Sequence, residues 1–201
     1  MSDTTTAWSW ITDPPITFVP FDEVDTVVHR FQANLQSWGT MGGDSELSRR
    51  TNAHTGGAGF IAGLMITQLR QTRPVFQYSI CGQPVALMQL DLEGGCIEIK
   101  NVATHPGAAG GGGIMVEYAL NRIGHYNGQG AQFAPGIIYL ETYSADSTAA
   151  YEAMGFRSQG RKEMVLDANR SVLWVQVADR WHLAAAVTSG DTSYRSVVTV
   201  D

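Results

Sequence analysis

Charged residues are scarce in this chain, and basic residues are the scarcer kind. Charged side chains make up 16% of the 201 residues, and 19 acidic residues against 13 basic ones give a formal net charge of −6 at pH 7. The lack of a basic excess argues against binding to nucleic acid, because a phosphate backbone requires a positively charged face. An acidic surface remains compatible with a cationic substrate such as an amine.

Cysteines and long apolar runs are also few. Cys81 and Cys96 are the only cysteines, too few for a disulfide framework or a cysteine-based metal site, and we interpret them as buried thiols. No apolar run approaches the ~20 residues of a membrane-spanning helix. Residues 1–10 lack the basic and apolar segments of a signal peptide. The sequence therefore predicts no membrane partner and a cytoplasmic location, with export without a signal peptide left open.

Hydrophobic residues are plentiful enough for one domain with a real core, at 44% of the chain. Apolar, β-branched runs separated by glycine-containing turns predict an antiparallel meander of three strands, at 74–80, 85–92 and 96–104. A buried strand is expected at 137–142, parallel to its neighbour in the same sheet. Shorter strands are expected at 16–19, 164–166 and 172–177.

Apolar residues at helical spacing predict four helices. They lie at 21–38, 60–69, 114–123 and 146–154. Asp22 is expected to cap the first helix and Gly39 to end it, and Gly155 to end the last one. The order of strands and helices indicates an α/β fold with a mixed sheet.

The remaining segments are polar or rich in glycine. Residues 39–59 and 124–136 are predicted to be loops. The expected organisation is an N-terminal arm at 1–15, one domain at 16–180 and a C-terminal tail at 181–201 with one more candidate strand at 197–200. Three tryptophans near the N-terminus either line an acceptor pocket or pack in the core or arm: Trp8, Trp10 and Trp38.

A glycine-rich stretch is the most informative part of the sequence. The third strand of the meander runs through His105-Pro106 into a tract of glycines, Gly110 to Gly113, that opens a helix. Glycines let a ligand approach the backbone closely, and the amides and dipole at a helix start favour a pyrophosphate. A flexible linker or a tight turn is the alternative. The tract is neither a P-loop, since no Lys-Ser/Thr follows it, nor a good dinucleotide-binding fingerprint.

A second stretch follows the buried strand at 137–142. It runs from Ser144 to Phe156 and contains the element Tyr151-x-x-x-Gly155-Phe156. Together the two stretches resemble the GNAT superfamily of N-acetyltransferases over about residues 75–167. The family's glycine motif is Gln/Arg-x-x-Gly-x-Gly/Ala. Here Ala109 stands where Gln or Arg is usual, Ile114 where a small residue is usual, and Ser144 where Asn is usual.

The resemblance implies a fold, a reaction and a donor site. The fold is a mixed, mainly antiparallel sheet, flanked by helices, whose two central parallel strands splay apart. The reaction transfers an acetyl group from acetyl-CoA to a primary amine of a small molecule or peptide, by direct attack in a ternary complex and without a metal. The resemblance implies that the pantetheine lies along Val102, Ala103 and Thr104. It implies that the pyrophosphate is bound by Ala109, Gly110, Gly111, Gly112, Gly113 and Ile114, and that Ser144 lines the opposite wall.

The resemblance also implies catalytic roles. Tyr151 occupies the position of the acid that protonates the departing thiolate, and a tyrosine packed at a helix end is the alternative. An amine attacks only when neutral, so a carboxylate has to help remove its proton. Glu98 is the preferred base, because alternation along the strand is expected to put it on the same face as Val102. Glu141 is the second candidate, and either carboxylate could instead be solvated. His105 is expected to be a structural residue of the loop.

The departures at Ala109 and Ile114 keep a second class of function open. The alternative is a non-catalytic protein on the same fold, such as an effector, that binds acyl-CoA or a partner. The sequence identifies neither the acceptor nor the oligomeric state, and a homodimer is one option for the latter.

Overall fold

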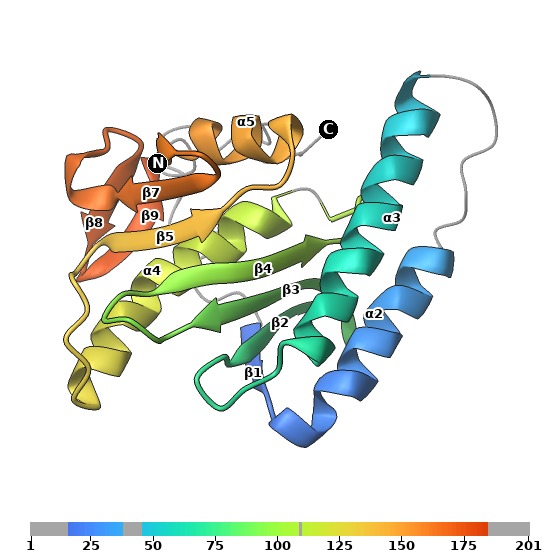
Figure 1. Ribbon diagram of the computed structural model, residues 1–201, viewed down its shortest axis with the longest axis horizontal. Coiled ribbons are helices and arrows are strands. Elements are labelled where there is room, and N and C mark those ends of the chain that lie inside the picture. The colour runs from blue at the N-terminus through green and yellow to red at the C-terminus, as the bar shows by residue number, and fades with distance from the viewer. Residues whose placement is uncertain (1–15, 38–45, 109, 185–201) are drawn as a thin grey trace, which may run out of the picture.

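The computed structural model describes residues 16–37, 46–108 and 110–184. Its centre is a seven-stranded sheet in the order β1-β2-β3-β4-β5-β7-β6 (Figure 1). All neighbours are antiparallel except β4 and β5, which are parallel. The strands are β1 (Ile16–Val19), β2 (Val75–Ile80), β3 (Gln83–Asp91), β4 (Glu98–Thr104), β5 (Ile137–Glu141), β6 (Arg157–Gly160) and β7 (Glu163–Asp167). The predicted meander and its parallel connection to β5 in one sheet are therefore confirmed, whereas β6 was not predicted.

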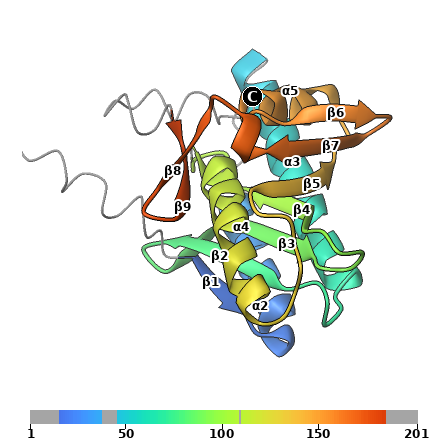
Figure 2. The ribbon, with the colours of Figure 1, turned by 90° about the vertical axis from the view of Figure 1, so that its left-hand side faces the viewer.

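Helices cover both faces of the sheet. α2 (Val24–Ser37) and α3 (Glu46–Thr67) lie on one face, and α4 (Gly111–Gly128) lies on the other (Figures 1 and 2). α5 (Ala145–Ala153) follows β5 and ends before Gly155, whose φ of 92° matches the predicted helix end. The prediction that Asp22 caps the first helix is wrong, because Asp22 lies inside a 3-10 turn, η1 (Phe21–Glu23), that no side chain caps. Gly39, the three tryptophans, Ala109 and the candidate strand at 197–200 lie outside the described residues.

The prediction of a loop at 39–59 is wrong from residue 46 onward, where α3 begins. Its glycines were interpreted as loop residues. Gly59 lies against α2, whereas a Cβ on Gly56 or Gly57 would meet no heavy atom within 4 Å. A Cβ at Gly59 would lie 3.8 Å from Leu35 Cδ1, and the Gly59 carbonyl accepts a hydrogen bond of 3.0 Å from Gln32 Nε2. Tertiary contacts thus outweigh the low helix propensity of glycine.

α4 is also longer than predicted. It begins three residues before Ile114 and continues to Gly128, so residues 124–128 of the predicted loop are helical. The turn after the helix is held by Asn127, whose amide group accepts from the Phe133 N–H at 2.8 Å and donates to its carbonyl at 2.9 Å.

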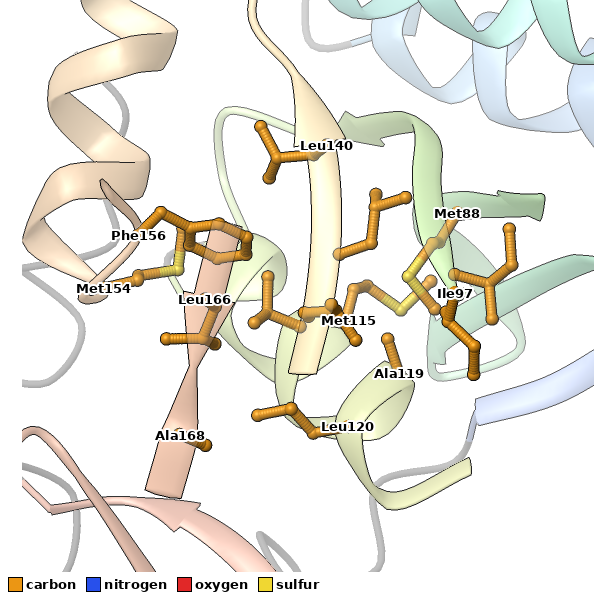
Figure 3. Packing of buried hydrophobic residues seen from close by; sticks show 14 of the residues in the cluster. Met88, Ile97, Met115, Ala119, Leu120, Leu140, Met154, Phe156, Leu166 and Ala168 are labelled. Carbon is orange, nitrogen blue, oxygen red and sulfur yellow. The ribbon is translucent and has the colours of Figure 1, made fainter. Parts of the chain in front are cut away.

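Two apolar clusters stabilise the sheet, one on each face. The smaller one joins α2 and α3 to the sheet through residues such as Val28, Phe31 and Met65, all fully buried. The larger one lies between α4, β5 and the neighbouring strands, and Figure 3 shows part of it. The residues labelled there come from β3, α4, β5 and the segments around them: Met88, Ile97, Met115, Ala119, Leu120, Leu140, Met154, Phe156, Leu166 and Ala168.

The two parallel strands separate soon after they meet. β4 and β5 pair only at Glu98 with Tyr139 and at Ile99 with Leu140. Beyond these two pairs β4 stays bonded to β3 as far as Thr104, and β5 stays bonded to β7 as far as Glu141. The central pair therefore opens toward the carboxyl ends of the strands, which is the splay that the resemblance implies.

A register shift in β4 changes which side chains share a face. Gln89 of β3 pairs with Asn101, but the next residue, Leu90, pairs with Ile99, so Lys100 is an extra residue. Such a bulge reverses the alternation beyond it. Glu98 therefore lies on the face opposite to Val102, and the expectation that the two share a face is wrong.

A separate hairpin ends the described chain. β8 (Trp174–Val177) pairs with β9 (Arg180–Leu183) in a sheet of its own, so the strand predicted at 172–177 does not extend the main sheet. Asn121 of α4 donates to the Trp181 carbonyl at 3.0 Å and accepts from its N–H at 2.7 Å. Glu117 Oε1 lies 3.2 Å from His182 Nδ1. These bonds join the hairpin to α4 across the domain boundary predicted at residue 180.

The two cysteines are less enclosed than predicted. Cys81 is exposed in the turn between β2 and β3, so its interpretation as a buried thiol is wrong. Cys96 is partly buried, and burial together with the negative charges of Glu98 and Asp91 raises the pKa of its thiol.

Candidate active site

A cavity of about 320 Å³ lies where β4 and β5 separate. It is bounded by the end of β4, by one face of α3, by α5 and by the first turn of α4. The residues that line it are Ala53, His54, Gly57, Ala58, Ile61, Val102, Ala103, Thr104, Gly112, Ser144, Asp146, Ser147, Ala150, Tyr151 and Met154. Small side chains on α3 and α5 leave this space open.

A smaller cavity of about 170 Å³ shares walls with the first. Both are lined by Val102, Ser144 and Tyr151, among others. Lys100, Asn101, Glu141 and Tyr143 line only the smaller one. Apolar and small groups make up most of the wall of the larger space, which also includes His54 and Asp146, whereas Lys100 and Glu141 lie at the smaller one.

The glycine tract forms the turn into α4 rather than a loose loop. Gly110 is the residue before the helix and has a φ of 85°, a left-handed conformation that glycine adopts without strain. The Gly111 N–H donates to the Ala108 carbonyl at 3.1 Å, and the Ile114 N–H to the Gly110 carbonyl at 3.1 Å. The first-turn amides of a helix have no acceptor within the helix itself. Gly112 therefore brings such an amide to the cavity wall.

The other described residues predicted to bind the pyrophosphate do not line the cavity. Gly110, Gly111 and Gly113 are buried, and Ile114 packs against the larger apolar cluster with its amide already bonded. Gly112 is the member of the described tract that lines the cavity. All three residues predicted for the pantetheine, Val102 to Thr104, line it as well.

Ser144 lies at the cavity as the cap of α5. Its Oγ accepts from the Ser147 N–H at 3.1 Å, and the Ser147 Oγ accepts from the Ser144 N–H at 3.2 Å, which completes a capping box. Serine is as good a helix cap as asparagine, so Ser144 caps α5 without need of an asparagine.

Tyr151 lines both cavities from the last turns of α5. Its side chain is partly accessible, yet burial of the phenol raises its pKa to about 12. The hydroxyl is therefore protonated at neutral pH and can donate a hydrogen bond. Its ring also meets Phe156 edge-on, with centroids 5.3 Å apart, so this position suits both the acid and the packing role.

The two candidate bases differ in their surroundings. Glu98 is not among the residues that line the two cavities, and its Oε1 lies 3.1 Å from Lys100 Nζ. Glu141 is exposed, lines the smaller cavity and accepts a hydrogen bond of 3.3 Å from the Tyr143 hydroxyl. Burial alone would lower the pKa of Lys100, but the hydrogen bond to Glu98 and the charges of Glu98 and Glu141 outweigh it and raise that pKa.

His105 organises the start of the glycine turn. It is buried. Its backbone N–H donates to the Val85 carbonyl at 2.8 Å, and its ring nitrogen Nδ1 accepts from the Gly107 backbone N–H at 3.0 Å. Burial lowers the pKa of His105, with a further contribution from nearby His54. These contacts fit the structural role expected from the sequence.

The α3 wall of the cavity was missed by sequence reasoning. Its residues recur at helical spacing, as at His54 and Ala58 or Gly57 and Ile61, and this spacing is the one signal that could have revealed it. The most polar member, His54, places Nε2 2.9 Å from the Thr104 carbonyl oxygen and 3.3 Å from Thr104 Oγ1.

In residues 16–37, 46–108 and 110–184, no group of three or more His, Cys, Asp or Glu side chains could hold a metal ion. None of the helices in that same part of the chain has the length and apolar character to cross a membrane.

Comparisons with known proteins give structural neighbours only. No protein-family model matches the sequence, and no curated protein matches it. A GCN5-related N-acetyltransferase from Rhodopseudomonas palustris is similar with a TM-score of 0.43 and 16% identity, over 84% of this chain and 89% of that one.

Two further neighbours have similar values. The PaiA N-acetyltransferase from Thermoplasma acidophilum, solved with coenzyme A, has a TM-score of 0.43 and 12% identity over 75% of this chain and 95% of that one. A GNAT family acetyltransferase from Brucella melitensis, solved with acetyl-CoA, has a TM-score of 0.41 and 14% identity over 76% and 86%. At these values the similarity carries no argument on its own, and the α/β, GNAT-like fold is defined by the strand order and the single parallel pair described above.

Proposed function

We propose that this chain is an acetyl-CoA-dependent N-acetyltransferase that transfers the acetyl group directly to a primary amine in a ternary complex. The observation that carries the proposal is the cavity at the separation of β4 and β5, which extends from Gly112 at the start of α4 to Tyr151 on α5. A donor bound there would have its phosphates near the helix start and its thioester near the candidate acid.

The walls of the cavity suit the two chemically different parts of the donor. Along Val102 to Thr104, β4 has no strand partner on the side of β5. Such an open strand edge can hydrogen-bond an extended ligand, as the two amides of a pantetheine arm require. The first turn of α4 offers an amide at Gly112 and the positive end of the helix dipole to a pyrophosphate.

The reaction requires one proton to leave the amine and one to reach the sulfur. The neutral amine attacks the thioester carbonyl carbon, the C–N bond forms, and the C–S bond breaks with its electron pair on sulfur. We assign the proton for the thiolate to the Tyr151 hydroxyl, because Tyr151 lines both cavities and is protonated at neutral pH.

For the base, the positions of the two carboxylates favour Glu141 over Glu98. Glu141 lines the smaller cavity together with Tyr151, so an amine held there would meet its carboxylate. Glu98 lies on the face opposite to Val102 and is paired with Lys100, which offsets its charge. Glu98 keeps a role in this scheme by holding the Lys100 ammonium next to the site.

Replacing Glu141 by glutamine is expected to lower kcat roughly tenfold to a hundredfold, which is below or at the lower limit of general-base effects. Acetyl-CoA affinity should not change, because Glu141 does not line the donor cavity. Glu98→Gln should lower kcat less, and Glu152→Gln, on the exposed side of α5, serves as the control. Steady-state measurements of kcat with a verified acceptor test this prediction. A larger loss of kcat in Glu98→Gln than in Glu141→Gln would assign the base to Glu98.

The proposed function is tested by binding and then by turnover. Calorimetric titration with acetyl-CoA should show one site per chain, and a thiol-release assay over a panel of amines should identify at least one acceptor. Absence of acetyl-CoA binding would overturn the proposal. Binding without thiol release on any amine would favour the other candidate, a non-catalytic acyl-CoA-binding protein, which the same cavity also suits.

A further inference from the structure

We propose that His54 is a positioning residue of the donor cavity: it fixes Thr104 at the end of β4 and thereby sets the place of the glycine turn. The inference rests on the proposed function in so far as that cavity binds acetyl-CoA. His54 belongs to no motif of the sequence, and it comes to the site from a helix that lies fifty positions earlier in the chain.

The contact between His54 and Thr104 is a hydrogen bond to the backbone. Nε2 of the imidazole lies 2.9 Å from the Thr104 carbonyl oxygen. A carbonyl only accepts, so Nε2 carries the proton. The Thr104 Oγ1 lies 3.3 Å from the same nitrogen. The imidazole therefore donates to the Thr104 carbonyl, and the Thr104 hydroxyl oxygen beside it shares the same proton only as a weaker second acceptor.

On its other side Thr104 faces the start of α4. Its Cγ2 methyl lies 3.6 Å from the position that a Cβ on Gly111 would take, so the two residues are neighbours and the glycine leaves a small space between them. Thr104 thus lies between α3 and the helix that presents Gly112 to the cavity. A threonine that changes its rotamer would place a different group beside Gly111 and so alter the surroundings of the glycine turn.

The segment between Thr104 and α4 is tied by short backbone bonds. The Ala108 N–H donates to the His105 carbonyl at 2.9 Å, and the Gly111 N–H donates to the Ala108 carbonyl at 3.1 Å. With the bond from His105 to β3 described above, these ties make the turn a connected unit from β4 to α4. His54 connects this unit to α3 through Thr104.

The anchoring of α3 does not depend on the imidazole. Ala58, Ala62 and Met65 are buried against α2 and the sheet. The Met65 carbonyl also accepts a hydrogen bond of 3.3 Å from buried Gln89. Removing the imidazole should therefore leave the helix in place and release Thr104.

The test compares two substitutions of His54 by calorimetric titration with acetyl-CoA. His54→Ala removes the donor and should weaken binding about threefold to tenfold, the range of one net hydrogen bond. His54→Gln keeps an N–H donor at nearly the same reach and should restore affinity to within about twofold of the wild type, since its bond can be remade. His29→Ala, an exposed histidine on α2, is the matched control and should bind as the wild type does.

Wild-type binding separates this inference from the proposed function. If the wild type binds acetyl-CoA and His54→Ala binds equally well, or if His54→Gln is as weak as His54→Ala, the positioning role is overturned and the function stands. If the wild type does not bind acetyl-CoA, the function fails, and hydrogen exchange still tests His54. The bonded amides of the turn, those of Ala108, Gly111 and Ile114, should exchange faster in His54→Ala than in His54→Gln, and equal exchange would overturn the inference.

Discussion

Replacing Gly112 by valine is expected to abolish acetyl-CoA binding while the protein stays folded. Gly112 is a half-buried residue in the first turn of α4, and it lines the larger cavity together with Ser144. A valine side chain there would occupy the space assigned to the pyrophosphate and keep the phosphates away from the helix amides. Loss of those contacts should weaken binding by at least about a hundredfold, which corresponds to about 2.8 kcal/mol.

The fold should tolerate this substitution, because valine has a somewhat higher helix propensity than glycine. Gly124→Val is the matched control: it lies in the same helix, is exposed, and a Cβ there would meet no heavy atom within 4 Å. Thermal melting curves of both variants should resemble that of the wild type, and only Gly112→Val should lose binding in the titration. Unchanged affinity in a folded Gly112→Val protein would remove the glycine turn from the donor site.

The sheet could be predicted from sequence because its signals are local. Gly82 and the pair Gly94-Gly95 have positive φ and form the turns of the meander, and apolar runs of strand length lie between them. The Tyr151-x-x-x-Gly155-Phe156 element likewise placed α5 and its end correctly. In these segments, local preference and tertiary structure agree.

The α3 wall could not be predicted because its signals are not local. Residues 52–59 contain three glycines and no large apolar side chain, which in isolation favours a loop. Their helical state depends on α2, whose Leu35 lies close to Gly59. The sequence-based prediction of the site therefore omitted the wall that α3 forms, and with it His54.

The face of Glu98 was mispredicted for a different reason. Alternation along β4 holds on each side of Lys100 but not across it, because the strand bulges there. Nothing in the run from Glu98 to Val102 marks a bulge, which becomes visible only when β3 is aligned beside β4. The choice between Glu98 and Glu141 thus depends on a pairing register that only the folded sheet defines.

Replacing Tyr151 by phenylalanine is expected to lower kcat roughly tenfold to a thousandfold. This range overlaps the lower part of the range typical of general-acid catalysis. The departing thiolate gains charge only as the C–S bond breaks, so a hydroxyl directed at it stabilises the transition state selectively. Acetyl-CoA affinity should change little, because the substitution keeps the ring and its edge-on contact with Phe156. Tyr139→Phe, on the exposed side of β5 and outside both cavities, is the matched control and should keep full turnover.

The pH dependence of turnover gives Tyr151 a second test. Burial raises the pKa of Tyr151 to about 12, so the hydroxyl remains the acid throughout the range in which the protein can be assayed. Tyr151→Phe should therefore reduce kcat by a similar factor from neutral pH to about pH 10, the usual pKa of a tyrosine, without moving the alkaline limb of the profile. Equal turnover of Tyr151→Phe and wild type, on a verified acceptor and with chemistry rate-limiting, would mean that water or another residue protonates the thiolate. Tyr151 would then be a packing residue of α5, and the cavity could still bind acetyl-CoA.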